Sequence, residues 1–161
     1  VDCGEDKHKE PHAWQCRVLG FRMTPNKVCP FVVRATPRGS ELLMFRHPRA
    51  GCQLVKGSIE PGEAPPETAL RELFEEAGIA DAHISDDLGL WDANAWAQVW
   101  SFQRCEPAQP LPELWSHYCA DGGGHVFEFF WHPLAEDPTD AFPVFVRAVQ
   151  FIRARLRESE R

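Results

Sequence analysis

The sequence predicts a layered α/β domain in which strands alternate with two amphipathic helices. Short β-rich stretches recur along the chain, as at 28–36 and 126–131, whereas helical periodicity is confined to 65–77 and 141–158. At 161 residues the chain is long enough for one domain that buries roughly two thirds of its unfolded surface. We therefore expect a single domain over 1–161, with residues 1–25 as a peripheral N-terminal extension.

Composition and charge limit the functions open to the chain. A hydrophobic content of 43% with 25% charged residues is typical of a globular protein. The net charge of −7 offers no broad basic field, so we expect no extended nucleic-acid surface. No apolar run of about 18 residues or signal region occurs, so we expect a cytoplasmic protein that does not enter membranes.

The cysteines favour reduced thiols over a disulfide framework. Six are present, none in a C-x-x-C pair, and a chain of this size does not need disulfides to fold. A zinc site at Cys3, His8, His12 and Cys16 is a possible alternative because His8 and His12 are four residues apart. Its spacing matches no familiar zinc module, which disfavours it.

The first half of the chain is predicted to be mainly β structure. A polar extension (1–16) precedes a short strand at 16–23 and a turn at 24–26. A hairpin follows, with strands at 28–36 and 41–46 joined by a turn at 37–40, and then a short strand at 53–55.

A helix is predicted in the second half of the stretch 57–79. An apolar stripe recurs at helical spacing, and Gly78 is suited to end the helix in a left-handed cap. The stripe consists of Leu70, Leu73, Phe74 and Ala77. Pro65 and Pro66 suit the first turn, where a missing N–H costs nothing.

The same helix carries a concentration of acidic residues that an ordinary helix would avoid. Glu72, Glu75 and Glu76 share one arc away from the apolar stripe, and like charges at this spacing repel by about 0.2–0.5 kcal/mol per pair. Two of them also lie in the last turn, where the helix dipole is negative. A divalent cation would reverse this penalty, whereas a merely solvated charged face is the alternative for a glutamate cluster alone.

The loop before the helix favours the cation. Gly57 and Gly62 allow close backbone approach or positive φ, and Pro61-Gly62 fits the centre of a type II turn. Such a loop would bring Glu63 and the Gly57 backbone back towards the acidic face of the helix.

The second half of the chain alternates strands with irregular segments. We predict a polar connection at 80–87, strands at 88–91, 95–102 and 126–131, and a last helix at 141–158. Its apolar face is formed by Phe145, Ala148, Val149, Ile152 and Leu156. The stretch 103–124 is expected to be irregular apart from a helical turn at 114–119, and to be either a lid facing substrate or a packing element.

The 57–79 stretch resembles the Nudix box, G-x5-E-x7-R-E-U-x-E-E-x-G-U with U apolar. Each defined position is filled, by Gly57, Glu63, Arg71, Glu72, Leu73, Glu75, Glu76, Gly78 and Ile79. The resemblance is looser from residue 28 to 131. It implies the Nudix fold, a mixed β-sheet sandwiched between α-helices.

The resemblance also implies an activity. Similar enzymes hydrolyse a pyrophosphate bond in a nucleoside diphosphate linked to another group, using Mg²⁺ or Mn²⁺. Glu75 and Glu76 are then the principal metal ligands, joined by backbone oxygen at Lys56 or Gly57. Glu72 either ligates the metal or deprotonates the attacking water, while Arg71 orients Glu75 or Glu63.

Several further site residues are expected outside the acidic helix. Such enzymes often recruit another acid, for which Glu128 is the first candidate and Asp121 the second. The ammonium of Lys56 is placed to pair with a phosphate oxygen, although a solvated lysine is an equal alternative. Aromatic candidates for contacting the nucleotide base are Trp91, Trp96, Trp100 and Tyr118.

Two other functions are consistent with the pattern. A non-catalytic Nudix-like domain would bind a nucleotide or a protein partner, but such domains typically lose a box acid and none is missing here. An isoprenoid diphosphate isomerase would require an altered box. The expected partner is a small nucleotide, and the sequence leaves open nucleoside triphosphates, dinucleoside polyphosphates, ADP-ribose-type nucleotides, capped RNA and the oligomeric state.

Overall fold

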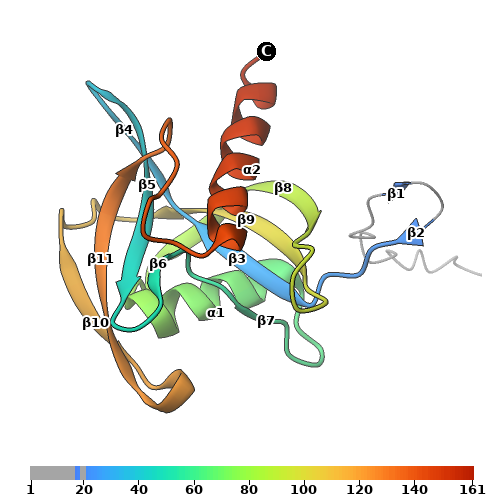
Figure 1. Cartoon of the computed structure of the whole chain (residues 1–161), viewed down its shortest axis with the longest axis horizontal. Helices are drawn as coiled ribbons and strands as arrows, with labels where there is room; N and C mark the ends of the chain where they lie inside the picture. Colours follow the sequence, from blue (N-terminus) through green and yellow to red (C-terminus); the bar gives the residue numbers. More distant parts are fainter. Residues whose placement is uncertain (1–16, 19–20) are drawn as a thin grey trace, which may run out of the picture.

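The computed structural model describes residues 17–18 and 21–161, which form two larger β-sheets, the separate two-stranded pair β1–β2 and two α-helices (Figure 1). The zinc alternative and most of the predicted extension lie outside these residues. The first elements are β1 (Arg17–Val18), β2 (Phe21–Arg22), β3 (Lys27–Phe31), β4 (Val33–Thr36), β5 (Gly39–His47), β6 (Gly51–Gln53), β7 (Gly57–Ser58) and α1 (Pro65–Ala77). The others are β8 (Ala82–Asp92), β9 (Val99–Pro107), β10 (Trp115–Cys119), the 3₁₀ turn η1 (Asp121–Gly123), β11 (His125–Pro133) and α2 (Pro143–Ser159).

The central layer is a mixed sheet with a helix on each face. Its strand order is β7-β3-β9-β8, and the β3–β9 pair is parallel while the other pairs are antiparallel. Successive residues of β3 point to opposite sides: Cys29 belongs to the core under α2, and Val28 to the core under α1. The predicted arrangement of a mixed sheet between helices is confirmed.

A second sheet stands beside the first and carries the C-terminal hairpin. Its order is β10-β11-β5-β4, with β6 paired to β5, and all of these pairs are antiparallel. The predicted hairpin is present as β4 and β5, although the strand expected at 28–36 is divided between the two sheets at Val32. Figure 1 shows β10 and β11 extending downwards past the end of α1.

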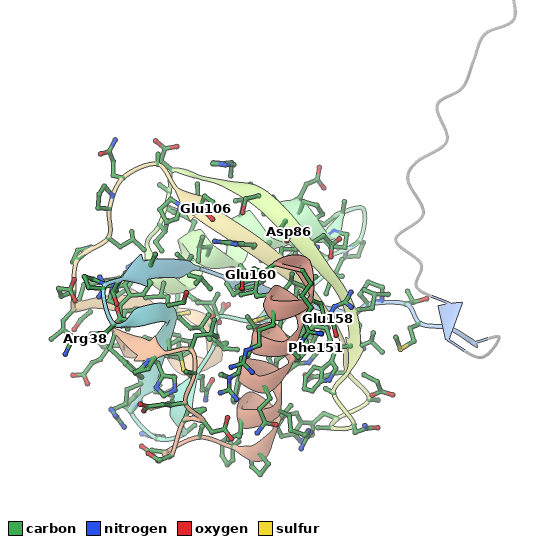
Figure 2. All side chains as sticks on the ribbon, turned by 90° about the horizontal axis from the view of Figure 1, so that it is seen from above. Arg38, Asp86, Glu106, Phe151, Glu158 and Glu160 are labelled. Carbon is green, nitrogen blue, oxygen red and sulfur yellow. The ribbon has the colours of Figure 1, made fainter. Side chains whose placement is uncertain are left out.

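The second helix packs as its sequence pattern predicts. Phe145, Ala148, Val149 and Ile152 are buried against the sheet, and Leu156 packs at the edge of the same core. Figure 2 views the molecule from above, with Phe151, Glu158 and Glu160 labelled along this helix.

The first helix is rotated relative to the predicted stripe. Leu73 and Ala77 are buried as expected, but Phe74 is 55% exposed. Thr68 and Glu72 face inward in its place. The prediction for Phe74 was wrong because it assumed that this helix would bury only apolar side chains.

Two predictions of irregular structure were also wrong. The polar segment 80–87 belongs largely to β8, an edge strand whose pairing is interrupted by two register shifts and in which residues 83 and 85–87 are exposed. The helical turn expected at 114–119 is instead β10, which pairs with β11. Its neighbour 103–107 continues β9, which reduces the irregular stretch to a short connection.

The state of the cysteines and the character of the helices were also predicted from the sequence. Cys29, Cys52, Cys105 and Cys119 are buried free thiols. Neither of the two described helices combines the length and the apolar character needed to cross a bilayer.

Candidate metal and phosphate site

A tight turn and a defined helix end place the acidic residues. The Glu63 amide donates to the Glu60 carbonyl at 3.0 Å, closing the predicted turn over Pro61 and Gly62, whose φ is 84°. Helix α1 then starts at Pro65 and ends at Gly78, whose φ of 73° is the left-handed cap expected from the sequence. These boundaries fix the rotation of the helix and therefore the direction of its glutamates.

Arg71 connects the turn to the acidic face of the helix. Its Nε donates to Glu63, its Nη1 to Glu72 at 2.7 Å and to Glu75 at 3.2 Å, and its Nη2 to the Ser58 carbonyl at 3.0 Å. Burial alone would lower the pKa of Arg71, but these carboxylates raise it overall. The guanidinium stays charged and holds the carboxylates in place, as the sequence suggested for Glu63 and Glu75.

The carboxylate of Glu63 faces this guanidinium and is not in the acidic group itself. It also accepts from the Thr68 hydroxyl at 2.8 Å. Burial acts to raise the pKa of Glu63, but the hydrogen bonds from Arg71 and Thr68 outweigh it and bring the pKa below its ordinary value. Glu63 therefore supports the network as an ionised acceptor.

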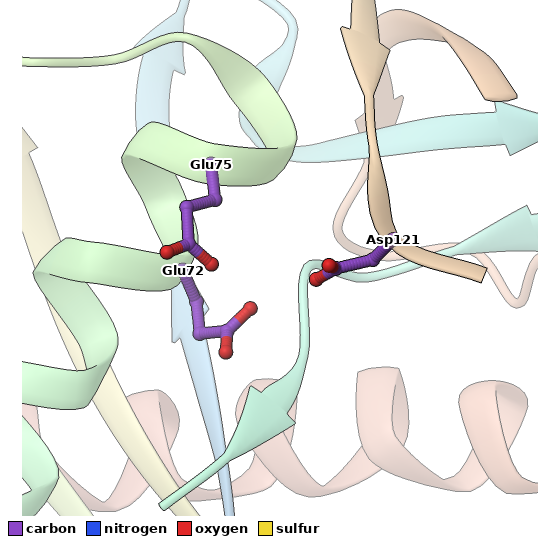
Figure 3. Close-up of side chains that lie close together, drawn as sticks. All are labelled: Glu72, Glu75 and Asp121. Carbon is purple, nitrogen blue, oxygen red and sulfur yellow. The ribbon is translucent and has the colours of Figure 1, made fainter. Parts of the chain in front are cut away.

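Three carboxylates from two distant segments meet at one point (Figure 3). Ligand oxygens of Glu72, Glu75 and Asp121 lie within 4.8 Å of one another. Asp121 reaches this point from the turn between β10 and β11. This spacing is consistent with oxygen ligands sharing a divalent cation.

Gly57 is required at this point by lack of space. A Cβ atom on residue 57 would overlap the Glu72 carboxylate. Because Glu72 is only 5% exposed, its carboxylate has little room to move aside. The box glycine therefore leaves space for an inward-facing carboxylate.

Burial and neighbouring carboxylates raise the pKa values of the inner glutamates. Burial raises the pKa of Glu72, with Glu75 and Asp121 adding to the effect and Arg71 opposing it. Burial and the Glu72 carboxylate raise the pKa of Glu76 to about 8, although its Oε2 accepts the Lys56 amide at 3.3 Å. A divalent cation beside these groups would stabilise their ionised forms, so the residues fit such an ion.

The hairpin that carries Asp121 is fastened to the end of α1. Trp115 donates through Nε1 to the Ala77 carbonyl at 3.1 Å, and His117 Nε2 lies 3.1 Å from the Glu75 carbonyl. The indole of Trp115 also stacks on Phe129, with ring centroids 4.9 Å apart. These contacts satisfy carbonyls that the last helical turn leaves free and keep the two acidic segments together.

The carboxylates line a cleft of about 690 Å³, within the range of small-molecule sites. Basic and polar groups are present on its walls together with the acids. The lining residues are Lys27, Lys56, Gly57, Ser58, Glu60, Arg71, Glu72, Glu75, Glu76, Tyr118, Cys119, Ala120 and Asp121. A polyphosphate could thus meet lysines on one side and cation-bound carboxylates on the other.

Among the acids proposed from the sequence, the structure brings Asp121 to the cleft and places Glu128 elsewhere. Glu128 is exposed on β11, opposite Arg46 in the register, and lines a separate pocket with Trp115 and Phe130. Glu76 lines the cleft but lies outside the group of three. Glu128 was the first candidate from the sequence because it is the single charge within an apolar strand, and Asp121 was the second.

Some of the basic and aromatic candidates line the cleft, and others point elsewhere. Tyr118 lines the cleft and is 62% exposed, whereas Trp91 packs against Trp100 in the core, with ring centroids 5.3 Å apart. The Lys56 ammonium is turned towards Gln98, and burial lowers its pKa. Lys27, which the sequence analysis did not consider, lines the cleft and donates to Ser58 Oγ at 2.5 Å.

The comparisons with known proteins place this fold and site in one family. The model of the NUDIX domain matches residues 25–147, so the chain belongs to the NUDIX family. The resemblance stated from the box is confirmed.

Relatives by sequence carry hydrolase names. The NAD-capped RNA hydrolase NudC of Haemophilus influenzae (strain PittGG) is 34% identical over 146 residues, covering 70% of this chain and 53% of that protein. An ADP-ribose pyrophosphatase of H. influenzae (strain ATCC 51907) is 27% identical over 100 residues, 54% of this chain and 46% of that protein. The chain spans about half the length of the curated relatives it matches.

Solved structures share the fold at low sequence identity. An ADP-ribose pyrophosphatase from Streptococcus suis superposes with a TM-score of 0.59 at 13% identity, covering 86% of this chain and 94% of that one. The NUDIX domain of NrtR from Shewanella oneidensis, solved in complex with ADP ribose, gives 0.55 at 17% identity, with coverages of 84% and 90%.

Proposed function

We propose that the protein is a hydrolase that uses Mg²⁺, or alternatively Mn²⁺, to cleave the pyrophosphate bond of a nucleoside diphosphate linked to another group. The observation that carries this proposal is the meeting of Glu72, Glu75 and Asp121 around the space left by Gly57. Family membership and the names of the relatives support the reaction class.

The carboxylates are assigned to the cation and to the attacking water. Glu72, Glu75 and Asp121 would hold the ion, with Glu76 behind them as a further acid. A bound divalent ion neutralises phosphate charge and lowers the pKa of bound water. Glu75 is the most exposed of the three acids Glu72, Glu75 and Glu76, with 41% of its side chain accessible. In addition to its place beside the ion, it is our candidate to accept the proton of the attacking water.

The remaining residues orient these groups and the phosphates. Arg71 is fully engaged with carboxylates and the Ser58 carbonyl, so it acts as a positioning residue and does not contact substrate. Lys27 is better placed than Lys56 to pair with a phosphate oxygen, because its ammonium bonds to the exposed Ser58 hydroxyl on the cleft wall. The Lys56 ammonium, in contrast, is part-buried over aromatic rings and directed at Gln98. The proposed location is the cytoplasm and the proposed partner is a small nucleotide.

The test is a hydrolysis screen with product masses. Purified protein is incubated with ADP-ribose, NAD, dinucleoside polyphosphates, nucleoside triphosphates and NAD-capped RNA, each with Mg²⁺, Mn²⁺ or excess EDTA. We expect metal-dependent cleavage between two phosphorus atoms of at least one compound, and no cleavage with EDTA. Binding of these nucleotides without any metal-dependent product would instead support the non-catalytic sensing function.

A further inference from the structure

A second cavity lies on the α2 side of the molecule, away from the acidic cleft. Its volume is about 320 Å³, and none of the described residues lines both cavities. It is bounded by the C-terminal half of α2, the turn between β4 and β5, and the segment that follows β11. Figure 2 labels Arg38 on that turn and Glu160 next to the end of α2.

Arginines dominate the charged groups of this cavity, which we call the arginine pocket. Four of them face two glutamates in its lining: Arg38, Arg104, Arg153 and Arg157 against Glu136 and Glu160. The lining therefore carries a formal charge of +2, although the whole chain carries −7. Guanidinium groups gathered in one hollow repel one another, and an anion placed among them would remove that repulsion.

Arg153 is held in place before any ligand arrives. Its Nε donates to the Leu134 carbonyl at 2.7 Å, and its Nη2 donates to Asp137 at 2.8 Å. Within residues 17–18 and 21–161 no acceptor is bonded to its Nη1. A guanidinium that is already fixed loses little side-chain entropy when it binds an anion, so Arg153 is preorganised for one.

Arg104 brings a donor that its own neighbours satisfy poorly. Its Nε is buried and lies 3.0 Å from a carboxylate oxygen of Glu106. The geometry of this ion pair is not that of a hydrogen bond, and in the part of the chain that the structure describes this Nε has no other partner. A buried donor without an acceptor is unfavourable, so an anion that engages this guanidinium would relieve the cost.

The other two arginines are exposed at the rim. Arg38 lies in the turn before β5, and Arg157 lies in the last turn of α2. The ion pairs formed among the described residues include neither of them. The pocket thus combines two part-buried guanidinium groups with two exposed ones whose donors are available to a ligand.

The floor of the pocket is apolar. Leu134 is buried in the core under α2, and Val33 and Leu156 pack against the same core while lining the pocket. An inorganic anion would contact the arginines and leave this apolar surface in water. A volume of about 320 Å³ is at the lower end of the range for small-molecule sites, so the lining fits an anion that carries a compact apolar group.

We propose that the arginine pocket binds an organic phosphate monoester. The phosphate lies among Arg104, Arg153 and Arg157, and the organic group lies on Val33 and Leu156. A phosphate suits these arginines better than a carboxylate, because its three terminal oxygens accept from several guanidinium groups at once. The site goes beyond the proposed function, since it needs no metal ion and lies on the face of the central sheet opposite the acidic cleft.

Three small probes test the chemical class of the ligand. Phenyl phosphate, benzoate and inorganic phosphate are titrated by calorimetry into the full chain with EDTA, because without a cation the carboxylates of the cleft repel anions. We expect phenyl phosphate to bind at least about tenfold more tightly than the other two. No binding of phenyl phosphate, or equal affinity for benzoate or inorganic phosphate, overturns the proposal.

Two matched pairs of variants separate the pocket from general attraction. Arg157→Gln and Arg161→Gln each remove one positive charge near the end of α2, but only Arg157 lines the pocket. The first should weaken phenyl phosphate by about tenfold and the second by less than about twofold. Glu160→Gln should tighten binding, whereas Glu158→Gln, which loses an ion pair with Arg155 outside the pocket, should not.

Arginine Nε signals in ¹H–¹⁵N spectra locate the anion. Phenyl phosphate should shift the signal of Arg104, assigned by its absence in Arg104→Lys, and leave that of Arg71 in the acidic cleft unchanged. A shift of Arg71 alone, or equal effects of Arg157→Gln and Arg161→Gln on affinity, would place the anion elsewhere and overturn the proposal. Binding in the pocket by a protein that fails the hydrolysis screen would leave this inference standing and remove only the proposed function.

Discussion

Helices α1 and α2 cover opposite faces of the same sheet, but they bury different kinds of side chain. Both begin with a proline and both are amphipathic. The buried residues of α2 are all apolar, whereas α1 buries Thr68 and Glu72 together with its apolar residues. The inward glutamate, Glu72, accepts a hydrogen bond from Arg71 and is repelled by neighbouring acids. A buried charge is less favourable than an apolar side chain in the same place, so the α1 face is less stabilising than the α2 face.

The difference indicates that the α2 face mainly stabilises the fold, whereas the α1 face carries the acidic site. Changes under α2 should reduce the free energy of unfolding and leave turnover intact, while changes in the acidic groups of α1 should do the reverse. Single substitutions on each face, with measurement of both the free energy of unfolding and kcat, distinguish these two roles.

The largest effect is expected from a cavity under α2. Ile152 is fully buried, and Ile152→Ala should lower the free energy of unfolding by about 2–5 kcal/mol. Urea unfolding monitored by circular dichroism measures this loss, and kcat measured well below the unfolding transition should stay within about twofold. A large fall in kcat in folded protein would show that the two faces are coupled.

Glu76→Gln on α1 is expected to have the opposite effect, a loss of turnover without a loss of stability. We expect kcat to fall at least about a hundredfold, a rise of about 2.7 kcal/mol in the barrier, because a charge next to the cation is lost. The free energy of unfolding without metal should stay equal or increase, since the ionised acid is disfavoured there. Near-normal turnover in folded Glu76→Gln would remove this residue from the metal site.

A smaller effect should appear in the pH dependence of stability. The pKa of Glu76 is raised from 4.5 to about 8 in the folded protein, so the unfolded chain releases this proton first. Stability of the metal-free protein should therefore fall as pH rises from 4.5 to 8, and the fall should be visible as a decrease in Tm. Thermal unfolding with EDTA and with saturating Mg²⁺ checks this: Mg²⁺ should raise Tm more at pH 8 than at pH 6, and Glu76→Gln should reduce the difference.

The smallest effect is expected from Glu128→Gln. Glu128 is exposed on β11 and lines a different pocket, so kcat and the Mg²⁺ dependence should change by less than about twofold. Asp121→Asn is the matched variant, and it should weaken the apparent Mg²⁺ affinity by about tenfold or more. Equal losses in both would return Glu128 to the metal site.

The parts of the fold that the sequence predicted well are those set by local patterns. The α1 boundaries follow from Pro65 and Gly78, and the buried face of α2 follows from its 3.6-residue period. The failures were decided by tertiary pairing. Edge strand β8 has a polar sequence, and β10 is a strand because β11 offers it a partner, which no short window of sequence reveals.

The same distinction applies to the site. The acids of the helix and their link to Arg71 could be predicted because they share one turn of one element. The choice between Glu128 and Asp121 depended on which residue of a hairpin faces the helix. Glu128 lies within β11 and Asp121 in the turn η1, so the answer depended on where the hairpin turns and on how it docks against α1.

The docking of β10 on the end of α1 has a consequence for how such a site can change during evolution. One acidic side chain of the proposed metal site is supplied by a turn that lies outside the helix, and Trp115 and His117 of the preceding strand β10 bond to backbone carbonyls of the helix. Lengthening or shortening this turn would withdraw one oxygen while every residue of the box stayed the same. Chains with identical boxes could in this way diverge in metal preference, or lose turnover and keep only recognition, through edits outside the signature by which they are usually grouped.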